Sequence, residues 1–169
     1  MSGSGIARRD SLEPARAGRP RDEVREFLAF GLQGERFALP LGSVREILKL
    51  SPITEVPRAR SHVIGILSVR GRVTTVYDLR RRLRMAPGEP TKQSRILLVD
   101  GGDEVIGLLV DEVHQVYRLH EDEVELAAVV ASDLSEYVLG IGRPAAERDE
   151  SRDGDDILIL LDPTPLLKR

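Results

Sequence analysis

The 169-residue chain contains no cysteine and no tryptophan. Without cysteine it cannot form disulfides, thiolate zinc sites or a cysteine nucleophile, which fits a reducing compartment. Its longest apolar runs, such as ILILL at 157–161, are far shorter than the roughly 20 residues needed to cross a bilayer. The N-terminus has no apolar segment that could act as a secretory signal. We therefore expect a soluble, cytoplasmic protein without direct membrane insertion.

Patterns typical of catalysis and of ligand binding are also scarce. The histidines His62, His114 and His120 lack the spacing of metal ligands and have no nucleophile to serve. No glycine-rich loop carries the lysine of a phosphate site. The acidic stretch 147–156 begins like a calcium loop but has Leu160 where a glutamate is required, so we interpret it as a solvated loop. We expect no enzymatic activity, no metal and no cofactor.

Local composition divides the chain into a tail and one domain. Residues 1–23 are rich in Arg, Ser, Gly and Pro without apolar periodicity, which predicts a disordered tail. Residues 24–169 carry the apolar strand patterns and are predicted to form the folded domain. Within them, the segment 41–50 has apolar residues at helical spacing, which predicts a short helix or a helical turn.

The folded part contains an internal duplication. Residues 95–116 align without a gap on residues 26–47, at a constant shift of 69 positions. Further on, VTTVYDL at 73–79 resembles ILILLDP at 157–163, with the extra length falling in the acidic stretch. Two copies of a strand-rich unit predict an all-β fold, built as two small barrels packed against each other.

The first copy spans about 26–84 and the second about 95–168. Equivalent apolar positions of the two copies have two interpretations, either lining the seam between the lobes or belonging simply to the core. These positions are Leu41 and Val44 in the first copy and Val110 and Val113 in the second.

A basic run follows the first copy's last strand and also has two interpretations. With Leu79 and Leu83 facing inward, the arginines form a solvated face of a helical turn. The alternative is a nucleic-acid-binding patch, although no aromatic stacking platform accompanies the run. The arginines concerned are Arg80, Arg81, Arg82 and Arg84.

A second arginine position is unusual because it lies in a predicted hairpin turn. The stretch 66–79 is predicted to fold as two strands about Arg70 and Gly71. Gly71 supplies the positive φ that a short turn needs, but Asn or Asp usually precedes the glycine. Arg70 is therefore interpreted either as a contact for a partner or as a solvated or internally paired side chain.

Taken together, the hairpin, the segment 36–48 and the repeat make the chain resemble the chemotaxis coupling protein family CheW over roughly residues 24–168. The matching segments are RFALPLGSVREIL (36–48), ITEVP (53–57), VIGILSVRG (63–71), VYDLRRRL (76–83), VIGLLVDEV (105–113), YVLGIG (137–142) and LILLDPTPLL (158–167). The resemblance implies two SH3-like, five-stranded β-barrels packed side by side. It also implies a non-catalytic adaptor that couples methyl-accepting chemoreceptor signalling tips to a CheA-type histidine kinase at receptor arrays, with other CheW-like domains as further possible partners.

Position by position, the resemblance places the family's receptor-binding groove on Leu41, Val44, Glu46, Arg70 and Val113. Arg70 would meet a polar or acidic group on a helical hairpin, with apolar residues receiving a helix face. The family's hairpin usually reads Asn-Leu-Arg-Gly, whereas this chain has Ser-Val-Arg-Gly, a difference that bears on partner identity. The kinase contacts are not assigned to individual residues.

Overall fold

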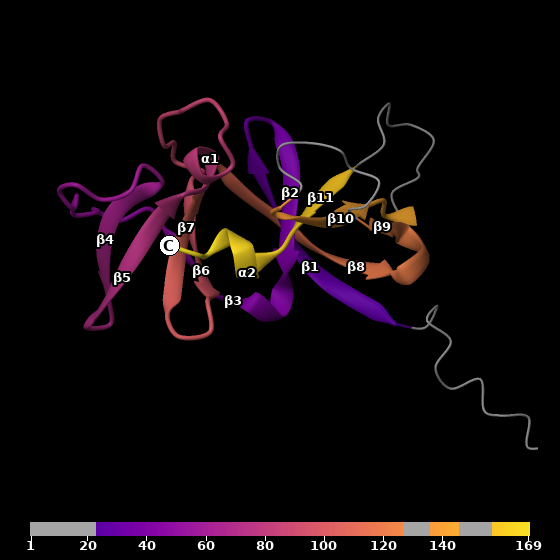
Figure 1. The fold of residues 1–169 in the computed structure, drawn as a ribbon. Coiled ribbons are helices and arrows are strands. Elements are labelled where there is room, and N and C mark those ends of the chain that lie inside the picture. The colour runs from indigo at the N-terminus through magenta and orange to yellow at the C-terminus, as the bar shows by residue number, and fades with distance from the viewer. Residues whose placement is uncertain (1–22, 127–135, 146–156) are drawn as a thin grey trace, which may run out of the picture.

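The structure, a computed structural model, describes residues 23–126, 136–145 and 157–169 (Figure 1). The predicted tail, apart from residue 23, and the acidic stretch 147–156 lie outside the described residues. The strands are β1 (Val24–Leu32), β2 (Glu35–Pro40), β3 (Val44–Lys49), β4 (Val63–Val69), β5 (Arg72–Asp78), β6 (Arg95–Asp100), β7 (Val105–Val110), β8 (Glu112–His120), β9 (Val124–Leu126), β10 (Val138–Gly142) and β11 (Leu158–Leu161). The helical turns are η2 (Leu41–Ser43), α1 (Leu79–Arg82), η3 (Glu121–Glu123) and α2 (Pro163–Leu166).

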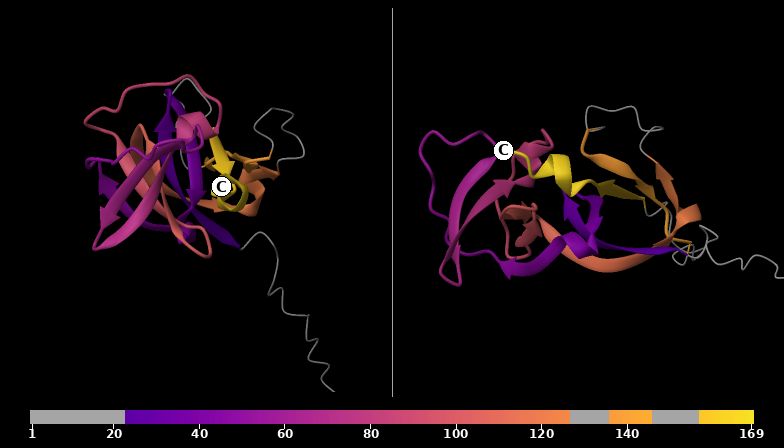
Figure 2. Two further views of the ribbon diagram at one scale, coloured as in Figure 1. Left: turned by 60° about the vertical axis from the view of Figure 1, so that its left-hand side comes forward. Right: turned by 60° about the horizontal axis from the view of Figure 1, so that its bottom comes forward.

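The strands form two sheets, each the framework of one lobe. Lobe I has the strand order β8-β1-β2-β11-β10-β9, and lobe II has the order β3-β6-β7-β5-β4. The lobes lie side by side, with α2 between them and the long strand β8 running from lobe II into lobe I (Figures 1 and 2). The predicted all-β class with two SH3-like lobes is confirmed, except that β9 gives lobe I a sixth strand.

The sheet topology shows the duplication directly. In lobe I, β8, β1, β2, β11 and β10 pair in the same sequence, and with the same directions, as β3, β6, β7, β5 and β4 in lobe II. Each sheet contains one parallel pair, β11 with β2 and β5 with β7. Strands of both sequence copies enter each sheet, because β3 crosses into lobe II and β8 crosses into lobe I.

The structure has three apolar clusters, and β1 is apolar on both faces because it lies between two of them. Successive residues of a strand point to opposite sides, so Phe27 and Ala29 enter the core of lobe I while Leu28 and Phe30 point the other way. The core of lobe II is smaller and contains Leu67, Val76, Ile96 and Leu98.

The third cluster, named here the central core, takes residues from both lobes and from both helices. Its buried members are Leu28, Phe30, Leu32, Phe37, Leu39, Tyr77, Leu79, Leu83, Leu97, Val99, Ile106, Leu108, Val110, Val138, Leu161, Leu166 and Leu167. Burial of this shared surface holds the two lobes together.

The segment 41–50 was predicted as a short helix or helical turn, and the helix prediction is wrong beyond its first turn. Only Leu41–Ser43 is helical, and Val44–Lys49 forms strand β3, which pairs with β6. Side-chain burial alternates along β3, so Ile47 is 44% exposed although helical spacing placed it with Val44. Its β-branched residues favour a strand, and the ladder with β6 decides the outcome.

The basic run after β5 also differs from its sequence-based prediction. The helical turn after β5 is confirmed, with the Asp78 carboxylate accepting hydrogen bonds from the backbone N–H groups of Arg80 and Arg81. The arginines do not form one solvated face, however. Arg80 pairs with Asp111, and Arg82 donates to the backbone carbonyls of Leu166, Pro165 and Lys168. These internal contacts take up two of the guanidinium groups that a nucleic-acid patch would need.

None of the helices among the described residues has the length and apolar character needed to span a bilayer.

Candidate functional site

Arg70 lies in the two-residue turn that joins β4 to β5. Its φ is 48° and that of Gly71 is 79°, so both residues occupy the left-handed region. Such a turn matches the right-handed twist of the two strands, but a residue with a Cβ atom is strained there. The turn thus keeps an arginine where asparagine or glycine would be easier to accommodate.

A bidentate ion pair ties this turn to strand β3. Arg70 Nη1 donates to Glu46 Oε2 at 2.6 Å, and Nη2 donates to Oε1 at 2.5 Å. The hydrogen bond from Arg70 lowers the pKa of Glu46 below its ordinary value. The Arg70 side chain nevertheless stays 73% exposed, so one face of its guanidinium remains open to a partner.

The three apolar residues of the predicted site share a second environment. Leu41, Val44 and Val113 are half-buried, and each packs against the central core. Val44 belongs to β3 of lobe II and Val113 to β8 of lobe I, so the pair spans the two lobes. The equivalent position Val110 is buried within the central core.

We call Leu41, Val44, Glu46, Arg70 and Val113 together the predicted receptor surface. The structure joins two of these residues in an ion pair and brings the other three onto one core. Val44 and Glu46 lie two residues apart on β3 with similar partial burial, which links the charged pair to the apolar residues.

Two exposed apolar side chains close to this surface were missed by the sequence reasoning. Val73 is 72% exposed and lies opposite Ser68 in the hairpin that carries Arg70. Ile47, on β3, is also exposed. Period-two alternation along β3 was the signal that could have identified Ile47, whereas β5 carries no such alternation at Val73.

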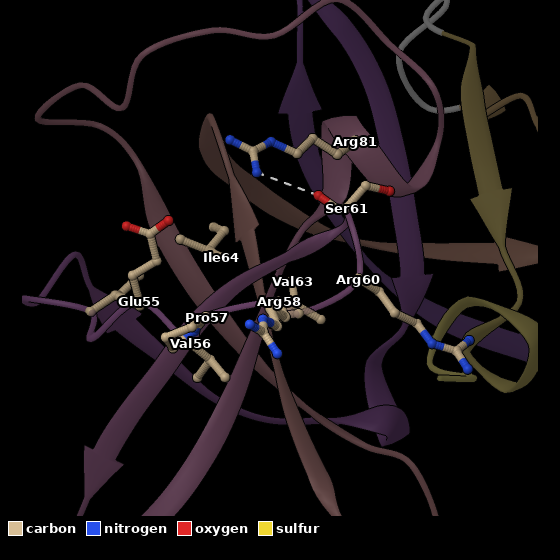
Figure 3. Close-up of a pocket in the computed structure, with 11 residues that line it drawn as sticks. Glu55, Val56, Pro57, Arg58, Arg60, Ser61, Val63, Ile64 and Arg81 are labelled. Carbon is tan, nitrogen blue, oxygen red and sulfur yellow. Dashed lines mark hydrogen bonds between the residues drawn. The ribbon is translucent and has the colours of Figure 1, made fainter.

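A separate hollow of about 460 Å³ lies beside the segment before β4 (Figure 3). Figure 3 shows Glu55 at the left, Arg81 at the top and Arg58 in the middle beside Val63, with Arg81 donating to the Ser61 carbonyl at 3.4 Å. Its lining contains one carboxylate, that of Glu55, and three arginines, Arg58, Arg60 and Arg81. No residue of the predicted receptor surface lines it.

His62 directly follows Ser61 of the hollow, and its side chain is buried. Its ring meets that of Tyr77 edge to face at a centroid distance of 4.7 Å, and its Nε2 atom has no hydrogen-bond partner among the described residues. Burial, together with the nearby charges of Arg82 and Arg60, lowers the pKa of His62 below its ordinary value. The fold therefore favours the neutral form of His62 over the protonated form.

We expect this burial to make stability depend on pH. The unfolded chain takes up a proton on His62 near pH 6.5, whereas the folded chain resists it, so the free energy of unfolding falls as the pH drops below about 6.5. The variant His62→Phe keeps the ring contact and removes this effect. Urea denaturation of both chains at intervals from pH 8 to pH 5.5 provides the test. Parallel curves over that range would show that His62 contributes no pH dependence.

The chain is similar to known proteins in both sequence and structure. Residues 26–169 match the CheW-like domain family. The chain is 33% identical over 110 residues to the probable chemotaxis protein CheW of Rhizobium etli, covering 65% of this chain and 71% of the relative. It is 34% identical over 102 residues to the chemotaxis protein CheW of Bacillus subtilis, covering 60% and 65%. The crystal structure of the scaffolding protein TtCheW from Thermoanaerobacter tengcongensis superposes with a TM-score of 0.74 at 27% identity, covering 87% of this chain and 94% of the other.

Proposed function

The chain belongs to the CheW-like domain family, and from this premise we propose that it is a non-catalytic adaptor in chemosensory signalling. In this role it couples methyl-accepting chemoreceptors to a CheA-type histidine kinase in the cytoplasm. Residues 24–169 act as the working unit. The relatives named above are chemotaxis proteins, and the superposed structure is a scaffolding protein, which supports this assignment.

The observation that carries the proposal is the exposed guanidinium of Arg70 on a fixed turn. Its ion pair with Glu46 holds it beside β3, whose residue Val44 is half-buried. A receptor helix presenting an acidic or polar group could pair with the open face of Arg70 and place apolar side chains against Val44 and Val113. Leu41 and Glu46 complete the proposed receptor-binding surface.

An adaptor of this kind acts by geometry. It holds the kinase where a conformational change of the receptor alters kinase activity, and this requires that both partners bind at the same time. The receptor and the kinase must therefore use different faces of the chain.

Simultaneous binding gives the test of the proposed function. A soluble receptor signalling fragment, immobilised on a sensor, should capture the chain, and the captured chain should then bind the kinase regulatory domain with undiminished stoichiometry. The kinase domain applied alone to the receptor surface is the control. If the kinase displaces the chain from the receptor, or if neither partner binds, the adaptor function is wrong.

A further inference from the structure

Hydrogen bonds around the Arg80–Asp111 pair join four segments of the chain. Its Nε atom donates to Asp111 Oδ1 at 2.9 Å and its Nη2 atom donates to Asp111 Oδ2 at 2.5 Å. Oδ2 also accepts a hydrogen bond from the backbone N–H of Gln33 at 2.8 Å. The Gln33 side chain in turn donates to the Ala86 carbonyl at 3.0 Å. The Asp111 carboxylate thus holds α1 and the β1–β2 turn, and Gln33 and Arg80 both donate to the Ala86 carbonyl of the connector that follows α1.

Asp111 occupies the point where the chain passes from one lobe to the other. It is the single residue between β7 of lobe II and β8 of lobe I, and its backbone N–H donates to the Gly31 carbonyl of β1 at 3.1 Å. Arg80 follows β5 of lobe II, while Gln33 and Gly31 belong to lobe I. The Arg80–Asp111 pair therefore connects the two lobes by polar contacts alongside the central core.

The pair is partly shielded from water. The Arg80 side chain is only 17% exposed, in contrast to the 52% exposure of its neighbour Arg81. Gly88 of the connector lies against the guanidinium, where an added Cβ would come within 2.0 Å of Nη1. A bidentate, shielded arginine–carboxylate pair is both stronger and more restrictive in direction than a surface ion pair.

We propose that Arg80 and Asp111 are positioning residues that fix the placement of lobe I relative to lobe II. Val113 follows Asp111 by two residues in lobe I, and Val44 lies in lobe II. Fixing the lobes fixes the spacing of these two valines, and so sets affinity for a receptor helix that must touch both. The consequence for affinity rests on the proposed function, whereas the effect on lobe placement does not.

Lobe placement is measured first, without any partner. The chain has no cysteine, so the double variant Lys49→Cys with Arg118→Cys takes spin labels at two exposed positions, one in each lobe. Pulsed electron spin resonance should give a narrow distance distribution. Adding Arg80→Ala or Asp111→Asn should broaden or shift it, whereas adding Arg81→Ala should not. Arg81 is the matched control because its ion pair, with Asp78 at 3.3 Å, stays within lobe II. An unchanged distribution in both test variants would overturn the proposal.

Receptor affinity is measured second, by calorimetry with the soluble signalling fragment. Arg80→Ala and Asp111→Asn should each weaken binding by at least about fivefold. The double variant should lose no more affinity than either single variant, because the two residues act as one pair, and Arg81→Ala should bind normally. Thermal melts identify any variant that fails to fold, and Asp111→Asn retains an acceptor for Gln33. A broadened distribution with unchanged affinity would support the effect on lobe placement and overturn its consequence for receptor affinity. If the unmodified chain does not bind the fragment, the proposed function is wrong, while the spin-label result still decides the effect on lobe placement.

Discussion

Replacing Arg70 by asparagine is expected to weaken receptor binding by at least about tenfold while leaving the fold intact. Asparagine accepts the left-handed backbone that Arg70 adopts at φ 48°, so the turn keeps its geometry. What disappears is the guanidinium, both its pairing with Glu46 and its open face. Calorimetric titration with a receptor signalling fragment measures the change in affinity.

Exchanging the two charges separates the internal role of Arg70 from its role in binding. Arg70→Glu alone places two carboxylates together, which adds repulsion to the loss of the guanidinium. The double variant Arg70→Glu with Glu46→Arg restores an ion pair in which the two charges have exchanged positions. If the guanidinium at the turn contacts the receptor, the double variant stays defective. Recovery of normal affinity in the double variant would mean that Arg70 serves only to pair with Glu46.

The second large effect is expected from the central core. Phe30 is fully buried, and its ring stacks on that of Phe37 with centroids 6.2 Å apart. Truncation by Phe30→Ala should lower the free energy of unfolding by about 3 to 5 kcal/mol, because it leaves a cavity where the two lobes meet. Unfolding of the variant should still occur in one cooperative transition, since both lobes share this core. Guanidinium chloride denaturation followed by circular dichroism measures both quantities.

An exposed residue supplies the control for this stability effect. Val73→Ala, at a position 72% exposed, should cost less than about 1 kcal/mol. Two separate transitions in the unmodified chain, or a cost for Phe30→Ala close to that of Val73→Ala, would contradict a core that stabilises both lobes together.

The duplication and the fold class could be predicted because they depend on patterns that repeat along the chain. Apolar alternation in 26–47 recurs in 95–116, and these stretches become β1 to β3 and β6 to β8. The exchange of strands between lobes was not predictable in the same way. It depends on where β3 and β8 find partners, which is a matter of long-range pairing rather than of local pattern.

The errors have the same physical origin. Residues 44–49 carry apolar side chains at spacings compatible with both a helix and a strand, and the ladder with β6 decides between them. The shielding of Arg80 depends on Asp111, which lies 31 positions away, so a basic run that looked solvated is in part internal. The pairing of Arg70 with Glu46 was likewise only one of several options for a hairpin arginine.

The most direct test of the proposed recognition surface is an NMR titration of the labelled chain with a receptor signalling fragment. Labels are placed on the valine methyl groups and on the arginine Nε atoms. The account predicts that signals of Val44, Val113 and Arg70 shift together at one saturating stoichiometry, while those of Val56 and Arg58 beside the separate hollow do not. Binding that leaves Val44, Val113 and Arg70 unperturbed would contradict it.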